Sequence, residues 1–382
     1  MPSETPHRSG RADAVAWTPS EPPVPSGLGA PSETLSPVAL LTRILALPGT
    51  SPAAPRRDPA ADPPPGRPAL ALVFPGQGAQ RPGMGAPWRD TAAWQTVQRL
   101  SESCGQDLAD LLLDADADRL RRPDNAQLAT LTLEMVMLRA LRESAPGRRF
   151  AACAGHSLGE YAALVAAGVL TPEDAVRVVA ERGAAMAEAA DRVPGAMAAL
   201  IGPGAAATAE RLTADLRATA AAQVWVANYN APGQVVVSGT PAAVAALAER
   251  AAEAGLRTAE LAVAGAFHTP LMAPARPRLA AALARVPTRP AHCPVVANVD
   301  GRAHLHHPER WRARALRQLT SPVRWEGSQR TLARLLRGRA HPVELGPGRV
   351  LAGLWTRTVP DQPARSAATP EQLHALTAAR LP

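Results

Sequence analysis

Short apolar runs alternate with helical patterns in the first part of the chain that reads as folded. The runs at 69–74 and 150–154 each end in a glycine-containing turn and predict two buried strands. The periodicity of apolar positions predicts helices over 88–100, 125–144, 158–167 and 172–190. Strands that alternate with helices are typical of a parallel sheet covered on both faces. We therefore predict an α/β architecture for this part of the protein.

A different pattern starts near residue 193. Strands are expected at 195–201, 224–229, 234–238 and 258–263, and helices at 205–218 and 241–255. The resulting β-α-β-β-α-β order is typical of the split-βαβ, or ferredoxin-like, arrangement. We predict a ferredoxin-like insert over 193–263, inside a large α/β domain built from 69–192 and 264–370, with a C-terminal tail over 371–382.

The N-terminal region differs in composition from the rest of the chain. Residues 1–68 hold 16 of the 40 prolines and are also rich in Ala, Ser and Gly. Such a segment cannot bury enough apolar surface to offset the entropy of ordering it. We expect residues 1–68 to be a mostly disordered extension.

Several classes of protein are disfavoured by composition. No run of 18 apolar residues occurs, so no spanning helix and no membrane partner are expected, and the N-terminus lacks the apolar core of a secretory signal. The three cysteines, Cys104, Cys153 and Cys293, are too widely spaced for a disulfide framework or a metal site. A reducing cytoplasm suits them. Monomer is the default expectation for the oligomeric state.

The formal net charge is +8, and all 41 basic residues are Arg. Residues 301–357 alone carry twelve Arg against three Glu, a surplus of +9. No aromatic stacking pattern or nucleic-acid motif accompanies them, so we do not expect a nucleic-acid partner. The segment is either a solvated Arg-rich face or a landing area for an anionic partner.

Gly155-His156-Ser157-Leu158-Gly159 is the strongest chemical signal. It is a G-x-S-x-G sequence between a predicted strand and a predicted helix, the context of a nucleophile in an α/β-hydrolase-like sheet. Ser157 needs a base, and nine His are present; His268, in a loop after the last strand of the insert, is one candidate. A second Gly-rich loop, at 74–80, could line an oxyanion site.

These motifs occur together in an order that resembles a known family. FPGQGAQ (74–80), GHSLGE (155–160), an Arg at 182, GAFH (265–268), Gln318 in QLTSPVRW, and ELGPG (344–348) follow one another. The chain resembles malonyl-CoA:acyl-carrier-protein transacylases and the malonyl-selective acyltransferase domains of polyketide synthases. The resemblance covers about residues 69–360.

The resemblance implies a role for each matching residue. Ser157 would become a malonyl ester and His268 would be its base, oriented by the main-chain carbonyl of Gln318. The backbone N–H groups of Gln77 and Leu158 would form the oxyanion hole, and Arg182 would bind the malonyl carboxylate. No third acidic residue is implied; Asp300 is the nearest candidate, and we expect it to take no part.

The resemblance also implies substrates and partners. Malonyl-CoA would be the donor and the phosphopantetheine thiol of an acyl carrier protein the acceptor, with no bound metal or cofactor. Phe267 would narrow the pocket against a 2-methyl branch, which in an apolar pocket is worth only about 1–3 kcal/mol. Two alternatives stay open: a proofreading acyl hydrolase of the same fold, and a non-catalytic binding module.

Overall fold

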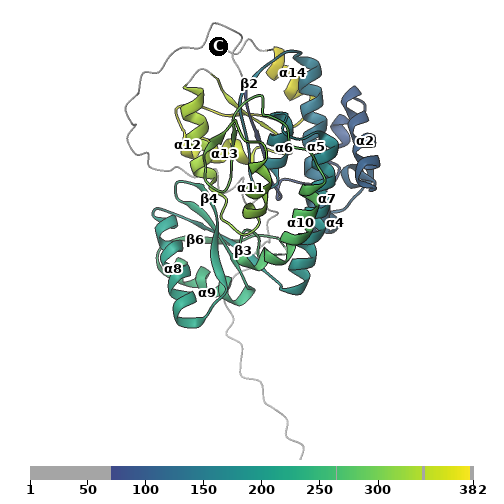
Figure 1. Cartoon of the computed structure of the whole chain (residues 1–382). Coiled ribbons are helices and arrows are strands. Elements are labelled where there is room, and N and C mark those ends of the chain that lie inside the picture. The colour runs from purple at the N-terminus through teal and green to yellow at the C-terminus, as the bar shows by residue number, and fades with distance from the viewer. Residues whose placement is uncertain (1–69, 264, 338–339, 379–382) are drawn as a thin grey trace, which may run out of the picture. The chain divides into compact units, whose positions relative to one another are not determined.

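Two separate sheets carry the fold of this protein (Figure 1). The computed structural model describes residues 70–263, 265–337 and 340–378, so the extension expected over 1–68 lies outside the described residues. The larger sheet has the strand order β10-β9-β1-β2-β7-β8. Its strands are β1 (Leu70–Phe74), β2 (Phe150–Gly155), β7 (Val295–Val296), β8 (Ala303–His304), β9 (Pro342–Leu345) and β10 (Arg365–Ala367). All neighbouring pairs are parallel except β7 and β8, which are antiparallel.

Helices cover both faces of the larger sheet. Alternate side chains of a strand point to opposite faces, so each strand contributes to two apolar cores. On β1, Leu70 and Leu72 join one apolar core, whereas Ala71 and Val73 join another. The first core is built with α2 (Gln95–Cys104), α3 (Leu108–Leu113), α4 (Ala117–Arg121), α5 (Pro123–Ser144), α6 (Gly159–Ala166), α7 (Pro172–Arg192), α10 (Arg276–Ala284), α11 (Arg310–Gln318) and α14 (Pro370–Ala378). The second is built with α12 (Trp325–Leu336) and α13 (Val350–Thr358).

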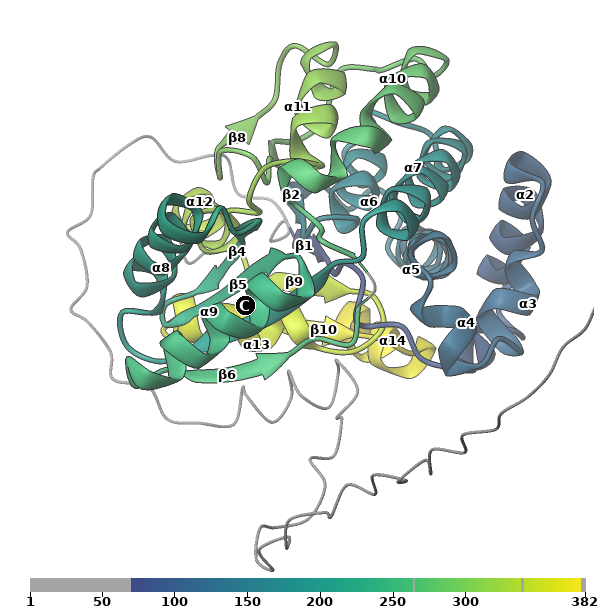
Figure 2. The same cartoon turned by 90° about the horizontal axis from the view of Figure 1, so that it is seen from below.

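The smaller sheet forms the insert. Its strands β3 (Ala196–Ile201), β4 (Val224–Ala231), β5 (Gln234–Gly239) and β6 (Arg257–Glu260) pair antiparallel in the order β4-β5-β3-β6. Helices α8 (Ala205–Ala220) and α9 (Pro241–Glu253) pack together on one face of it (Figure 2). This is the ferredoxin-like arrangement, so the predicted fold class is confirmed.

The insert is fastened to the large domain by backbone contacts. The N–H of Tyr229 on β4 donates to Val323 O at 2.9 Å, and the N–H of Val323 donates to Ala227 O at 2.8 Å. A Cβ added to Gly195 would lie 2.1 Å from the backbone nitrogen of Ala266, so the chain enters and leaves the insert through closely packed segments. Strand β4 of the insert therefore pairs with the loop of the large domain at Val323.

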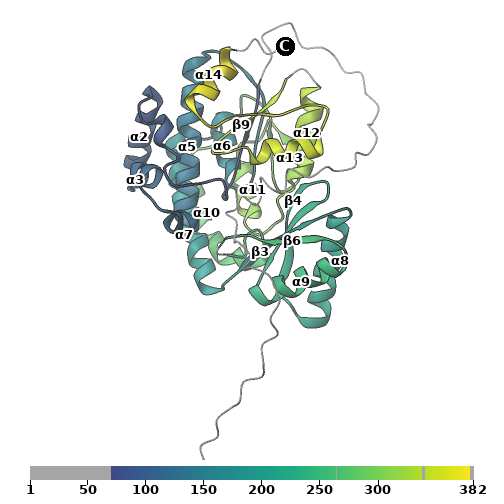
Figure 3. The same ribbon diagram turned by 180° about the vertical axis from the view of Figure 1, so that it is seen from behind.

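Two segments differ from the expectations. The helix predicted over 88–100 begins only at Gln95, because two 3-10 turns precede it and bury Trp88, whose indole N–H donates to Ala368 O at 3.1 Å. The tail predicted over 371–382 instead contains most of α14, which lies beside α5 (Figure 3) and buries Leu373 and Leu376. Its apolar face makes it part of the fold. Within the described residues, every helix is too short or too polar to cross a bilayer.

Candidate active site

Ser157 lies at a sharp turn between β2 and α6. Its φ of 51° is in the left-handed region, which a residue with a side chain adopts only where the surroundings impose it. Two features impose it here: the His156 N–H donates to Phe74 O at 2.9 Å, and Gly159 presses so closely on β1 that an added Cβ would lie 2.1 Å from Phe74 O. The turn presents the Ser157 hydroxyl at the carboxyl end of the sheet.

His268 meets this hydroxyl from a distant loop. Its Nε2 lies 2.8 Å from Ser157 Oγ, and its Nδ1 lies 3.0 Å from the main-chain O of Gln318. A carbonyl oxygen can only accept, so Nδ1 carries the proton and the lone pair of Nε2 faces the Ser157 hydroxyl. The ring is therefore oriented as a base for Ser157 by a main-chain group, and no carboxylate of the described residues hydrogen-bonds to it.

The environment of His268 keeps the imidazole neutral. Burial lowers its pKa to about 3; the Arg182 cation lowers it too, and the hydrogen bond to Gln318 acts in the opposite direction. A neutral imidazole is the form that can accept a proton.

Arg182 is a buried cation beside the nucleophile. Its side chain is fully buried, and its Nη2 lies 3.4 Å from Ser157 Oγ and donates to Gln318 Oε1 at 3.1 Å. Its Nη1 donates to the side-chain oxygen of Gln127, and the Tyr161 ring lies 5.5 Å from the guanidinium carbon. No carboxylate of the described residues forms an ion pair with it, and its Nε has no acceptor among them. Burial lowers the pKa of Arg182. The Glu160 carboxyl, whose own pKa burial raises to about 7, acts on this cation without contacting it. A buried cation without a contacting counter-ion is costly, so the site is suited to an anionic ligand.

Asn298 and Glu160 support the turn at Ser157 through hydrogen bonds. The sequence analysis assigned no role to either residue. Asn298 Oδ1 accepts the N–H of Ser157 at 2.6 Å, its Nδ2 donates to Gly155 O at 2.6 Å, and its N–H donates to Glu160 Oε1 at 3.1 Å. Gln318 Nε2 donates to Ser157 O at 2.9 Å and to the second Glu160 oxygen. Burial raises the pKa of Glu160 to about 7. These contacts fix the backbone of the nucleophile from both sides.

The Gly-rich loop after β1 lies next to the same turn. Phe74 is in register with Gly155, so both loops leave the sheet at one edge. The Gln77 side chain is connected to the Arg182 cluster, since its Oε1 accepts from Gln127 Nε2 at 3.3 Å. Among the hydrogen bonds of the described residues, none uses the backbone N–H of Gln77 or Leu158 as a donor, so both remain available to an oxyanion.

A pocket of about 380 Å³ reaches this cluster between the two domains. The insert contributes Trp225 and Tyr229 to its lining, and the large domain contributes His268 and Thr320. Phe267, which precedes the base, is only 6% exposed. The structure thus brings together every sequence-predicted site residue except Phe267. Phe267 lies in the same loop as His268, but it does not line the pocket.

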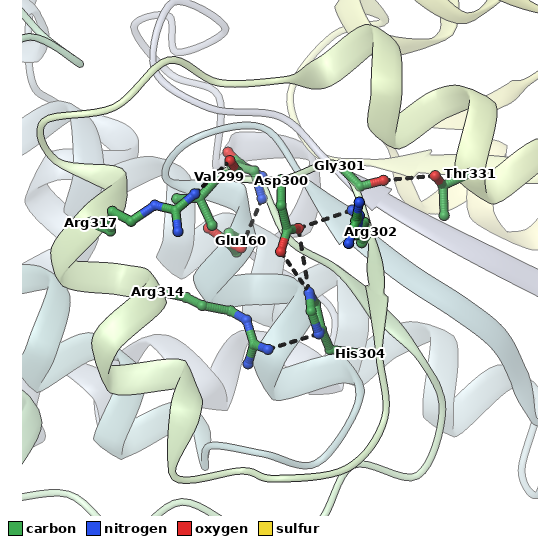
Figure 4. A network of polar contacts seen from close by, with 10 residues as sticks. Glu160, Val299, Asp300, Gly301, Arg302, His304, Arg314, Arg317 and Thr331 are labelled. Carbon is green, nitrogen blue, oxygen red and sulfur yellow. Dashed lines mark hydrogen bonds and ion pairs between the residues drawn. The ribbon is translucent and has the colours of Figure 1, made fainter.

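Asp300 belongs to a different network. Figure 4 shows its carboxylate against His304, whose Nε2 lies 3.1 Å from Asp300 Oδ2, while Arg314 donates to His304 Nδ1 at 2.7 Å. None of the contacts of Asp300 reaches His268. In the described part of the chain no three His, Cys, Asp or Glu side chains are grouped so that they could hold a metal ion.

Comparison with known proteins agrees with the fold and the geometry. The acyl transferase domain family matches residues 71–370, which is most of the chain. A serine with a neutral histidine beside it, on an α/β sheet that carries a ferredoxin-like insert, is therefore the site of an acyltransferase.

Individual relatives narrow this class. The chain is 39% identical to the malonyl CoA-acyl carrier protein transacylase of Bacillus subtilis over 75% of this chain and 89% of the relative, and 39% identical to that of Escherichia coli K12 over 76% and 93%. The crystal structure of the Xanthomonas oryzae malonyl-CoA:acyl carrier protein transacylase matches with a TM-score of 0.75 and 38% identity, covering 81% of this chain and 98% of that one. The chain belongs to the malonyl-CoA:acyl-carrier-protein transacylase family.

A prediction follows from the low pKa of His268. We expect the acylation rate to stay level as the pH falls through about 6.5, the ordinary pKa of an imidazole, because the buried ring stays neutral there. Single-turnover release of the CoA thiol from malonyl-CoA, recorded from about pH 8 to about pH 4.5, measures this rate. Ser157→Ala gives the background at each pH. An acid limb centred at about 6.5 that persists in Glu160→Gln would contradict the expectation, because the Glu160 carboxyl, with a pKa of about 7, titrates in the same range.

Proposed function

We propose that this protein transfers a malonyl group from malonyl-CoA to the phosphopantetheine thiol of an acyl carrier protein, through an ester on Ser157. The names of the Bacillus subtilis and Escherichia coli relatives support this reaction. A structure described as a type II polyketide synthase acyl carrier protein in complex with its malonyl-transacylase also matches this chain, with a TM-score of 0.75 and 35% identity over 80% of this chain and 97% of that one. The reaction would serve fatty-acid or polyketide biosynthesis.

The first half-reaction loads the enzyme. Ser157 Oγ attacks the thioester carbonyl while its proton passes to His268 Nε2, 2.8 Å away. The negative charge that develops on the carbonyl oxygen is stabilised by the backbone N–H groups of Gln77 and Leu158. When the tetrahedral intermediate collapses, the C–S bond breaks and the CoA sulfur takes the proton from His268. Ser157 is left as the malonyl ester.

The second half-reaction runs the same steps in reverse with a different thiol. His268 accepts the proton of the phosphopantetheine thiol, and the thiolate attacks the ester carbonyl. The C–O bond to Ser157 then breaks and the proton returns to the serine oxygen. Ser157, His268 and the two thiols account for every bond made or broken and for every proton moved. The reaction needs none of the three free cysteines. The proposal keeps the monomeric state and the cytoplasmic location that the sequence leads us to expect.

The buried Arg182 carries the assignment of the substrate. Its guanidinium lies beside Ser157 without a carboxylate partner among the described residues, so the free carboxylate of a malonyl group would supply the missing counter-ion. An acetyl group has no such charge. The preference for malonyl over methylmalonyl is assigned to Phe267, which precedes the base in the chain and whose ring would leave little room for a branch.

The proofreading hydrolase is the second candidate, since it would use the same nucleophile and base. Incubation with malonyl-CoA followed by intact-protein and peptide mass spectrometry separates the two. We expect a malonyl adduct on Ser157 that persists until a holo-carrier protein is added and then appears on the carrier. Rapid release of free malonate without a carrier would contradict malonyl transfer. Ser157→Ala, which removes the acceptor oxygen, is the control.

The role of Arg182 predicts a change of selectivity. Arg182→Ala should lower kcat/KM for malonyl-CoA by about 100-fold or more, because the carboxylate would then be buried without a partner. Activity with acetyl-CoA, which never uses this charge, should fall far less. The ratio of the two does not depend on how much of the variant is folded. Arg177→Ala, which removes a half-exposed Arg of the same helix, should leave the ratio unchanged; an unchanged ratio in Arg182→Ala would exclude the role.

The Arg-rich segment over 301–357 predicts different salt sensitivities for the two half-reactions. Some of its cations have structural partners, since Arg314 bonds to His304 and Arg317 to Val299 O (Figure 4), but Arg302 and Arg310 are exposed. We propose that the exposed cations attract the acidic carrier protein. The segment lies partly on α11, which ends at Gln318 and leads into the loop whose Thr320 and Pro322 line the pocket.

Transfer from malonyl-Ser157 to the carrier should therefore slow as salt rises, because the Debye length shrinks from about 10 Å at 0.1 M to about 3 Å at 1 M. Acylation by malonyl-CoA should change less. Stopped-flow measurement of each half-reaction tests this, and Arg302→Ala/Arg310→Ala should reproduce the effect of salt on the second. Arg99→Ala/Arg250→Ala removes the same charge from exposed sites elsewhere and is the control. Equal salt sensitivity of both half-reactions would contradict this docking role.

A further inference from the structure

A second and larger hollow, of about 720 Å³, lies away from the catalytic residues. Phe150, the first residue of β2, lines it, whereas Ser157 comes two residues after Gly155, the last residue of the same strand. A strand of six residues spans about 20 Å, so the two sites are at opposite ends of the sheet. None of the residues assigned to malonyl transfer lines this hollow.

The lining is strongly basic. Four arginines contribute to it: Arg142, Arg148, Arg149 and Arg289. No Asp or Glu does. Asp174 lies 3.7 Å from Arg289 and is shared with Arg177 at 3.2 Å, so it offsets only part of one of these charges. The hollow therefore holds a surplus of positive charge that the fold does not neutralise.

Two of the four cations lack any acceptor among the described residues. Arg142 has partners, since its Nη2 lies 3.4 Å from Val165 O and 3.3 Å from Ala166 O. By contrast, the Nη1 of Arg148 is shielded from solvent and has no hydrogen-bond partner, and the side chain of Arg149 forms no hydrogen bond or ion pair with the described residues. A shielded N–H donor without an acceptor costs free energy, which an oxygen of a bound ligand would restore.

We propose that this hollow is a binding site for a phosphate-bearing small molecule that carries at least two negative charges. Planar guanidinium groups suit phosphate oxygens, because two parallel N–H donors can contact one phosphate group. The volume falls within the range of about 300–1,000 Å³ that small-molecule sites occupy. Leu141, Phe150 and Leu170 add apolar surface, on which a non-phosphate part of the ligand can pack. This site is separate from malonyl transfer and does not depend on it.

Calorimetric titration of the full chain with two probes tests the proposal, in phosphate-free buffer at low salt. Inorganic pyrophosphate presents the charge alone, and ADP adds a base and a ribose. Arg148→Ala/Arg149→Ala should weaken binding of at least one probe by about tenfold or more, because it removes charge-assisted hydrogen bonds. Arg99→Ala/Arg250→Ala, which removes the same charge elsewhere, should bind as the unmodified protein does. Malonyl transfer should be equal in all three proteins.

The pattern across the probes identifies the kind of ligand. Loss of pyrophosphate binding in Arg148→Ala/Arg149→Ala means that the phosphates suffice; loss of ADP binding alone means that the apolar wall contributes. ADP bound where CoA binds would not be weakened by this substitution, so only the difference between the variants counts. If neither probe binds, or if both double variants bind equally well, the proposal is wrong.

Arg149→Glu is a second test, which keeps the proposal testable if the double variant folds poorly. Arg149 is exposed and has no partner among the described residues, so its replacement should leave the melting temperature unchanged. The new carboxylate should repel either probe and weaken binding at least as much as removal of the charge does. Binding by Arg149→Glu that equals that of the unmodified protein would overturn the proposal, whatever the double variant does.

Discussion

The buried guanidinium of Arg182 is the constraint on which the rest of the site depends. Keeping a cation away from water without a counter-ion is unfavourable, and the fold meets that cost with neutral partners: two Gln oxygens and an aromatic ring. Neutral partners solvate the charge without cancelling it. The same charge helps to keep His268 deprotonated and faces Ser157 Oγ, so the group that would recognise the substrate also prepares the base.

Gln318 links these functions through three separate groups. Its main-chain oxygen fixes the tautomer of His268, its side-chain oxygen accepts from Arg182, and its side-chain nitrogen donates to the backbone of Ser157. A carboxylate in its place could orient the imidazole, but it would also pair with Arg182 and cancel the charge left for the ligand. The main-chain carbonyl of Gln318 thus orients the imidazole without adding a charge next to Arg182.

The sequence predicted the parts of the structure that depend on local pattern. The strand-turn-helix around Ser157 and the six elements of the insert could be predicted because apolar periodicity and glycine placement encode them within a few residues. Loop position made His268 one candidate base among nine His, and the resemblance then assigned it that role. Asn298 and Gln127 could not be found, since they lie 141 and 55 residues from their partners Ser157 and Arg182. The packing of α14 was not predicted because the helix has few apolar positions, and these are buried only by its contact with α5.

Water is the competitor that separates a transferase from a hydrolase, and the burial of the cluster bears on it. Arg182 is fully buried and His268 is 5% exposed, so water reaches the base through the pocket between the two domains. An acyl group whose carboxylate pairs with the Arg182 guanidinium would fill the space next to Ser157 and be held in one orientation. A shorter, uncharged acyl group would leave that space and that cation to solvent. The charge that selects the acyl group would therefore also protect its ester until the carrier thiol arrives.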